Sequence, residues 1–194
     1  DIASIFKKRF QARLFKSNKI PSKELINSLL EKTFNLVASK QSLMPYKVIV
    51  FGPEHAETKN KLWDATAWQW KNGKKLDQIY TNERTGVHVG TIQLMAPYVI
   101  CFADRAVDDH NSSVKRKLDK GHPYGTLKSR GDVPTKSIEV GMFATILTGL
   151  CMENNFGVSY QLCFGVNKWK HKNEIVLFSM QFGYPNNKRI EKGD

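Results

Sequence analysis

The sequence holds few of the residue patterns that perform chemistry unaided. Its histidines are His55, His88, His110, His122 and His171. They show no HxxxH spacing, and no carboxylate or cysteine recurs near them at the sequence spacing of metal ligands, so we expect no metal centre. The chain has no GxGxxG, P-loop or GxSxG motif, which argues against a dinucleotide fold, a nucleotide loop and a nucleophilic serine. Among enzymes, these gaps favour one that borrows the chemistry of a cofactor.

The composition is that of a folded, basic protein. The 194 residues include 30 Lys and Arg against 18 Asp and Glu, a formal net charge of +12, and 41% of them are hydrophobic. A chain of this size and composition can bury a core, which excludes intrinsic disorder. No linker-like stretch divides it, so we expect one domain over residues 1–194.

Several features together predict a cytoplasmic location. The best apolar runs, Tyr46–Phe51 and Tyr98–Ala103, have the length of strands, so no membrane span is expected. Charged residues stand where an N-terminal secretory signal would need its apolar centre. The cysteines Cys101, Cys151 and Cys163 are odd in number and lie among apolar residues, which is typical of reduced thiols.

The surplus of positive charge leaves three interpretations open. Tryptophans lie near lysines in the sequence, as stacking residues do in proteins that bind single-stranded nucleic acid. They are Trp63, Trp68, Trp70 and Trp169. Against nucleic-acid binding, the cations are scattered from Lys7 to Lys192, and no zinc-finger, RRM or KH signature is present. A solvated basic surface is the simplest interpretation, and a few cations holding the phosphate of a small cofactor are the third.

Apolar periodicity predicts an alternation of helices and strands. Ser22 is expected to cap a helix over 23–38, whose apolar residues recur at steps of three and four. The other expected elements are helices over 2–10, 54–71 and 137–155 and strands over 46–51, 93–104, 158–164 and 174–182. Residues 105–134 are polar and broken by Gly and Pro, which predicts a long surface excursion. This order indicates an α+β or mixed three-layer fold with a central sheet.

One run near the N-terminus carries a more specific signal. Arg9-Phe10-Gln11-Ala12-Arg13-Leu14-Phe15 resembles the opening of the FMN-dependent nitroreductase family, whose first helix ends in Arg-x-Ser-x-Arg-x-Phe before an Ile-Pro and a long amphipathic helix. Residues 37–46 match, in weakened form, the family's Ala-Pro-Ser-x-x-Asn-x-Gln-Pro-Trp before a strand. Residues 139–158 are similar to its central helix and exit, and residues 174–189 to its closing strand, Gly-Tyr-Pro turn and basic tail. Residues 52–134 match only loosely.

The resemblance implies a fold, an assembly and an activity. The fold would be a three-layer α+β domain with a central mixed, mainly antiparallel sheet flanked by helices. The chain would form an obligate homodimer with two FMN molecules at the interface, and Gly141, Ala144 and Gly149 in the central helix suit such close helix contact. The activity would be that of an oxidoreductase that passes a hydride from NADH or NADPH through FMN to an electron-poor organic acceptor.

The resemblance also implies which residues bind FMN. Arg9 and Arg189 match the positions that bind the phosphate, with Lys188 as a nearby candidate. Arg13 matches the position that faces the pyrimidine edge of the flavin, where its charge would stabilise the reduced ring. Gln11 replaces the usual serine, and its amide can still bond to ribityl or ring oxygens.

Some positions depart from the family pattern. Ser42 stands where the flavin-contacting asparagine would be, and Met44 replaces the glutamine. The Pro-Glu-Gly turn of many members is not recognisable in residues 159–165. These departures keep a second hypothesis open, in which the fold persists with a degraded flavin site and the basic surface contacts nucleic acid or another polyanion.

Overall fold

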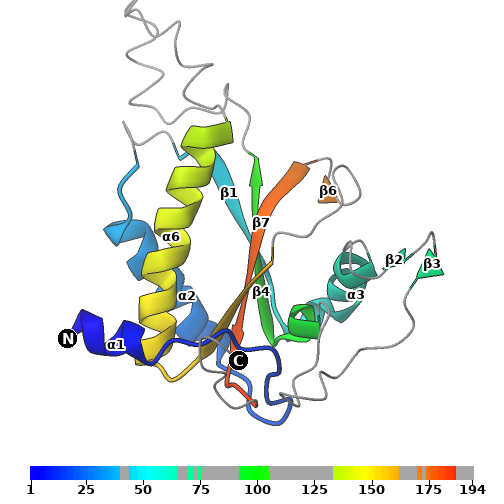
Figure 1. The fold of residues 1–194 in the computed structure, drawn as a ribbon, viewed down its shortest axis with the longest axis horizontal. Helices are drawn as coiled ribbons and strands as arrows, with labels where there is room; N and C mark the ends of the chain where they lie inside the picture. Colours follow the sequence, from blue (N-terminus) through cyan, green and yellow to red (C-terminus); the bar gives the residue numbers. More distant parts are fainter. Residues whose placement is uncertain are drawn as a thin grey trace, which may run out of the picture.

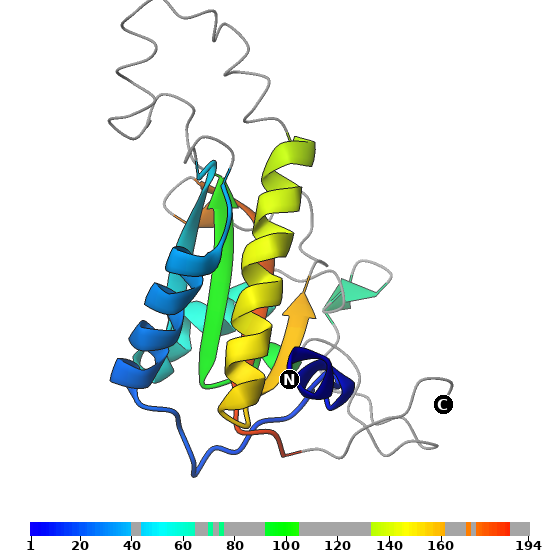
Figure 2. The same ribbon diagram turned by 90° about the vertical axis from the view of Figure 1, so that its left-hand side faces the viewer.

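The chain folds into three layers, a central sheet with helices on each of its faces. The computed structural model describes residues 1–39, 44–64, 70–71, 74–75, 92–104, 133–161, 170–171 and 174–186. Helices α2 (Lys23–Leu36) and α6 (Val133–Glu153) lie side by side on one face of the sheet, and α3 (Ala56–Asp64) with the 3-10 helix η4 (Ile92–Met95) covers the other (Figure 1, Figure 2). This arrangement confirms the predicted α+β fold.

The central sheet has the strand order β1-β4-β7-β5. Its strands are β1 (Tyr46–Phe51), β4 (Tyr98–Asp104), β7 (Glu174–Gly183) and β5 (Gly157–Gln161). Their pairings are all antiparallel, and β6 (Lys170–His171) pairs with β7 in the same sense. A separate small ribbon joins β2 (Trp70–Lys71) to β3 (Lys74–Lys75). The parallel component among the described residues is a single bridge between Gln11 and Val158, so β5 is an edge strand that receives an N-terminal segment.

The larger core lies between the sheet and the paired helices. Ser22 accepts a hydrogen bond from the amide of Leu25 at 3.2 Å, which caps α2 as predicted. The buried aromatic residues Tyr46, Phe102 and Phe143 then meet edge to face, with ring centroids 5.5 to 6.1 Å apart.

No helix in the described part of the chain is long and apolar enough to cross a membrane.

Several predicted boundaries of helices and strands are wrong. The helix expected over 54–71 is a 3-10 turn, η2 (Pro53–His55), followed by α3, and it ends at Asp64. The strand expected from residue 93 starts at Tyr98, because residues 92–95 form η4 and Pro97 has no amide hydrogen for a β ladder. The first helix, α1 (Ile2–Lys7), stops short of residue 10.

The central helix differs from its prediction at its start. It begins at Val133 instead of after Ser137, because Pro134 in the first turn has a fixed φ that suits a helix and needs no hydrogen-bond partner there. At its other end Asn155 adopts a left-handed φ of 59°, and the amide of Phe156 donates to the carbonyl of Cys151 at 2.9 Å. Most of the excursion expected over 105–134 lies outside the described residues.

Lys59 ties α3 to the start of β4. The residue is buried, and its ammonium donates to the carbonyl oxygens of Ala96 at 3.0 Å and Pro97 at 3.2 Å. Burial lowers the pKa of Lys59, so these two hydrogen bonds offset a desolvation cost. Lys59→Met leaves both carbonyls without this donor, and we expect the free energy of unfolding in urea to fall by about 2 kcal/mol.

Lys61 on the same helix supplies the matched control. Its ammonium lies 2.7 Å from the carboxylate of Glu57, and both side chains are largely exposed. Exposed pairs of this kind contribute little, so Lys61→Met should leave the urea midpoint close to that of the wild type. Equal losses in the two variants would mean that Lys59 stabilises the fold no more than a surface lysine does.

Candidate functional site

An irregular N-terminal segment, residues 9–19, passes the end of the sheet where β5 begins and β7 ends (Figure 1). The amide of Ala12 donates to the carbonyl of Val158 in β5 at 3.0 Å. Further on, the amide of Lys16 donates to Tyr184, and the amide of Asn186 donates to Leu14. The segment therefore joins β5 to the turn that follows β7, and its side chains are placed by both.

A glycine makes this close approach possible. A Cβ added at Gly157 would stand 2.7 Å from the Cβ of Ala12 and 2.9 Å from the Cβ of Pro185. Real Cβ atoms do not approach so closely, so any larger residue must push these backbones apart. Gly157 is thus the point where the N-terminal segment, β5 and the turn after β7 meet.

Arg9 lies at the start of this segment and is half-buried. Its guanidinium carbon is 4.8 Å from the centroid of the Tyr160 ring, a cation–π contact. The hydroxyl of Tyr160 bonds to Thr148 of α6, so this ring lies on the face of the sheet that α2 and α6 cover.

Gln11 and Arg13 contact the opposite face. The amide nitrogen of Gln11 donates to the hydroxyl of Ser159 at 3.5 Å. The guanidinium of Arg13 donates to the side-chain carbonyl of Gln93 at 3.4 Å, and Gln93 in turn donates to Gln161 at 2.7 Å. The structure therefore brings Arg9 and Gln11 to one strand, β5, and links Arg13 to that strand through Gln93 of η4, with these contacts divided between its two faces.

The sheet face beside Arg13 is polar although it is buried. Its buried polar residues are Gln93, Ser159, Gln161, Ser179 and Gln181. Two of their atoms, Gln161 Nε2 and Gln181 Oε1, have no hydrogen-bond partner among the described residues. A buried polar atom left unpaired costs about 1 to 3 kcal/mol, so such a cluster is unusual in a face that only serves packing.

These polar residues were missed in the sequence, although a signal was present. In Ser159-Tyr160-Gln161 and Ser179-Met180-Gln181-Phe182 polar and apolar residues alternate. Because successive side chains of a strand point to opposite faces, this pattern predicts one polar face on both strands.

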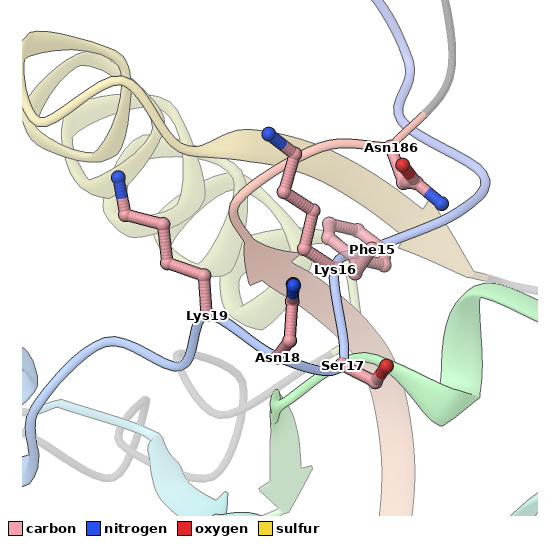
Figure 3. Close-up of a pocket in the computed structure, with 6 residues that line it drawn as sticks. All are labelled: Phe15, Lys16, Ser17, Asn18, Lys19 and Asn186. Atoms are coloured by element: carbon pink, nitrogen blue, oxygen red, sulfur yellow. The ribbon is translucent and has the colours of Figure 1, made fainter.

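A basic pocket lies next to the turn after β7. It has a volume of about 620 Å³ and is lined by Phe15, Lys16, Ser17, Asn18, Lys19 and Asn186. Figure 3 shows the side chains of Lys16 and Lys19 extending to the same side of the loop. The ammonium of Lys19 also lies 4.1 Å from the centroid of the Tyr184 ring. Lys188 and Arg189 follow Asn186 closely in the sequence but lie outside the described residues, as does Ser42.

Met44 belongs to the core and not to this edge. Its thioether accepts from the hydroxyl of Tyr46 at 3.8 Å and packs against the larger core. Its backbone amide donates to the hydroxyl of Ser39, which donates to the carboxylate of Glu139. The methionine at position 44 is therefore accommodated by apolar packing.

The described cysteines are structural. Cys101 and Cys151 are free and buried, and burial raises the pKa of both thiols. A neutral, enclosed thiol is a poor nucleophile, so neither residue is suited to covalent catalysis. Cys163 lies outside the described residues.

Comparisons with known proteins show that solved structures share the fold of this chain. No protein-family model and no curated protein matches the sequence. A nitroreductase-like protein from Streptococcus mutans superposes with a TM-score of 0.67 at 13% identity, covering 98% of this chain and 93% of that one. A candidate NAD(P)H:FMN oxidoreductase from Staphylococcus epidermidis gives 0.67 at 12%, covering 100% and 91%. CLA-ER, an enone reductase of gut-bacterial fatty acid saturation, gives 0.68 at 12%, covering 100% and 93%.

These structural similarities extend over essentially the whole chain. They confirm the fold that the resemblance of residues 9–15, 37–46, 139–158 and 174–189 implied.

Proposed function

We propose that this chain, which has the nitroreductase fold, is an FMN-dependent NAD(P)H oxidoreductase. Bound FMN would supply the redox chemistry, taking a hydride from NADH or NADPH and passing it to an electron-poor organic acceptor. The observation that carries the proposal is that Arg9 and Gln11 contact the edge strand β5 of this fold, and that Arg13 is linked to the same strand through Gln93. One structure of similar shape is described as a candidate NAD(P)H:FMN oxidoreductase and another as an enone reductase.

The cations of this edge fit the phosphate of FMN. A phosphate needs charged donors, and arginine offers its oxygens a planar fork. Arg9 supplies such a fork and is held against Tyr160, so less side-chain entropy is lost when it binds an anion. We propose Arg189 and Lys188 as further phosphate ligands.

Arg13 and Gln11 fit the polar edge of the flavin ring. A guanidinium only donates hydrogen bonds, so Arg13 would bind ring oxygens and stabilise the negative charge of the reduced ring. The bond from Gln11 to Ser159 is long, at 3.5 Å, and a ligand oxygen can replace it at little cost. We propose Ser42 as an additional polar contact to the ring.

The proposed activity is tested with FMN-loaded protein mixed with NADH or NADPH in the absence of oxygen. The visible absorbance of the flavin should be lost, and a nitroaromatic or enone acceptor should restore it. Free FMN under the same conditions is the control. Absorbance that stays unchanged with both nicotinamides would contradict the proposal.

We also propose that the chain forms a homodimer through its helical layer. Large apolar side chains of α1, α2 and α6 are exposed there, namely Ile2, Phe34, Leu36, Ile138 and Met142. A pocket of about 360 Å³, lined mainly by apolar residues of the same three helices, lies beside them. A Cβ added at Gly141 would meet no atom within 4 Å, which leaves room for a second copy. Exposed apolar side chains gathered on one layer in this way are typical of an interface.

Light scattering is expected to give a mass twice that of the 22.2 kDa chain. Met142→Glu should produce monomers, because it places a charge in the covered apolar layer. Met95→Glu is a matched control, since Met95 is equally exposed, at 39% against 38%, but lies on η4 across the sheet. A monomeric wild type at micromolar concentration would refute the homodimer.

A second candidate function is the binding of a polyanion. The observation that favours it is the pocket bounded by Lys16 and Lys19, together with the net charge of +12. Such binding releases counterions and must weaken steeply with salt. Retention on a heparin column that is absent, or unchanged by salt, would exclude this function.

A further inference from the structure

The edge strand β5 is connected to the N-terminal segment through three consecutive side chains, two of them directly and one through Gln93. Ser159 accepts from Gln11, Tyr160 lies under Arg9, and Gln161 connects to Arg13 through one intervening residue. Since neighbouring side chains of a strand point to opposite faces, Tyr160 acts on one face and Gln161 on the other. The two arginines are therefore held by separate sets of contacts.

The orientation of Tyr160 is fixed by a directed chain of hydrogen bonds. The hydroxyl of Thr148 donates to the carbonyl of Ala144 at 2.7 Å, which uses its single proton. The Tyr160 hydroxyl must then be the donor in its bond to Thr148. The Tyr160 ring also packs against Phe178, with centroids 5.5 Å apart. The ring beneath Arg9 is thus anchored at its hydroxyl and supported at its side.

The donors and acceptors in the hydrogen bonds around Arg13 can be assigned in the same way. A guanidinium has no acceptor, so the atom of Gln93 that it contacts must be the carbonyl oxygen. The amide nitrogen of Gln93 is then the donor to Gln161 at 2.7 Å. Gln93 and Gln161 are almost fully buried, so neither side chain can turn towards water. This pair gives the guanidinium of Arg13 a fixed acceptor.

We propose that β5 positions the two arginines independently, with Tyr160 aligning Arg9 for the phosphate of FMN and Gln161, through Gln93, aligning Arg13 for the flavin ring. This inference rests on the proposed function. Tyr160, Gln93 and Gln161 are positioning residues, since they act through the arginines. Holding a long cationic side chain in its binding geometry raises affinity because less freedom is lost on binding.

Comparing FMN with riboflavin, which lacks the phosphate, separates the two roles. Tyr160→Leu removes the cation–π contact and should raise the dissociation constant for FMN about five-fold, while that for riboflavin changes by less than about two-fold. Gln161→Met removes the acceptor for Gln93 at similar volume and should raise both dissociation constants by the same factor, about five-fold. In an Arg9→Ala background, Tyr160→Leu should have no further effect on FMN.

The outcomes distinguish positioning from general stability. If Tyr160→Leu weakened FMN and riboflavin equally, or if Gln161→Met weakened FMN alone or neither, the inference would be overturned while the proposed function stood. A wild-type chain that bound neither flavin would overturn both. If Tyr160→Leu fails to fold by circular dichroism, Thr148→Val provides the second variant. It frees the Tyr160 hydroxyl at nearly constant volume and should also weaken FMN alone.

Discussion

Gly157→Ala should lower the affinity for FMN by more than about ten-fold and destabilise the fold by about 1 to 3 kcal/mol. The added Cβ would stand 2.7 Å from Ala12 and 2.9 Å from Pro185, so the N-terminal segment and the turn after β7 must both move away from β5. That movement displaces Arg9 and Arg13 together. Isothermal titration with FMN and urea denaturation measure the two effects.

Gly149→Ala is the matched control for this change. A Cβ at Gly149 would meet only the ring of Phe6, at 3.6 Å, which is ordinary van der Waals contact. Since Gly149 lies inside α6, alanine should stabilise that helix by up to about 1 kcal/mol in urea, where Gly157→Ala should destabilise the fold. If Gly157→Ala bound FMN as tightly as the wild type, the edge of β5 would not be the flavin site.

Arg9→Ala should raise the dissociation constant for FMN about ten-fold or more, and Arg189→Ala should do the same. A charge-assisted hydrogen bond to phosphate contributes about 1.5 to 3 kcal/mol, which corresponds to that factor. Fluorescence titration with FMN at fixed ionic strength measures the change.

Lys32→Ala controls for the loss of one positive charge. Lys32 is exposed on α2, away from β5, and its removal changes only the general electrostatic attraction. The expected effect is less than two-fold, by the screening of exposed charges at about 0.15 M salt. Similar, small effects for Lys32, Arg9 and Arg189 would place the phosphate site elsewhere.

Local patterns were enough to predict most of the secondary structure. The apolar run Tyr46–Phe51 is a strand with the predicted bounds, and the stripe after Ser22 forms α2. The errors arise where a residue type is compatible with two kinds of local structure. Proline breaks helices, so Pro134 favours the excursion in the sequence, but in the first turn of a helix proline is tolerated. Residues 92–95 are apolar enough for a strand, yet Pro97 prevents continuous pairing with β4.

The candidate site was only half visible in the sequence. Arg9, Gln11 and Arg13 lie within five residues of one another, so a short motif identifies them. Gln93 and Gln161 come from segments far apart in the chain and meet only because η4 covers the face on which β5 projects alternate side chains. Contacts of this kind depend on sheet order, which the sequence pattern did not specify.

Titration of the purified, flavin-free chain with FMN is the sharpest test of a flavin site at β5. We expect saturable quenching of FMN fluorescence at one flavin per chain, with Arg9→Ala requiring about ten-fold more FMN for half saturation. Protein that carries no flavin absorbance when purified, and takes up no FMN on titration, would contradict it.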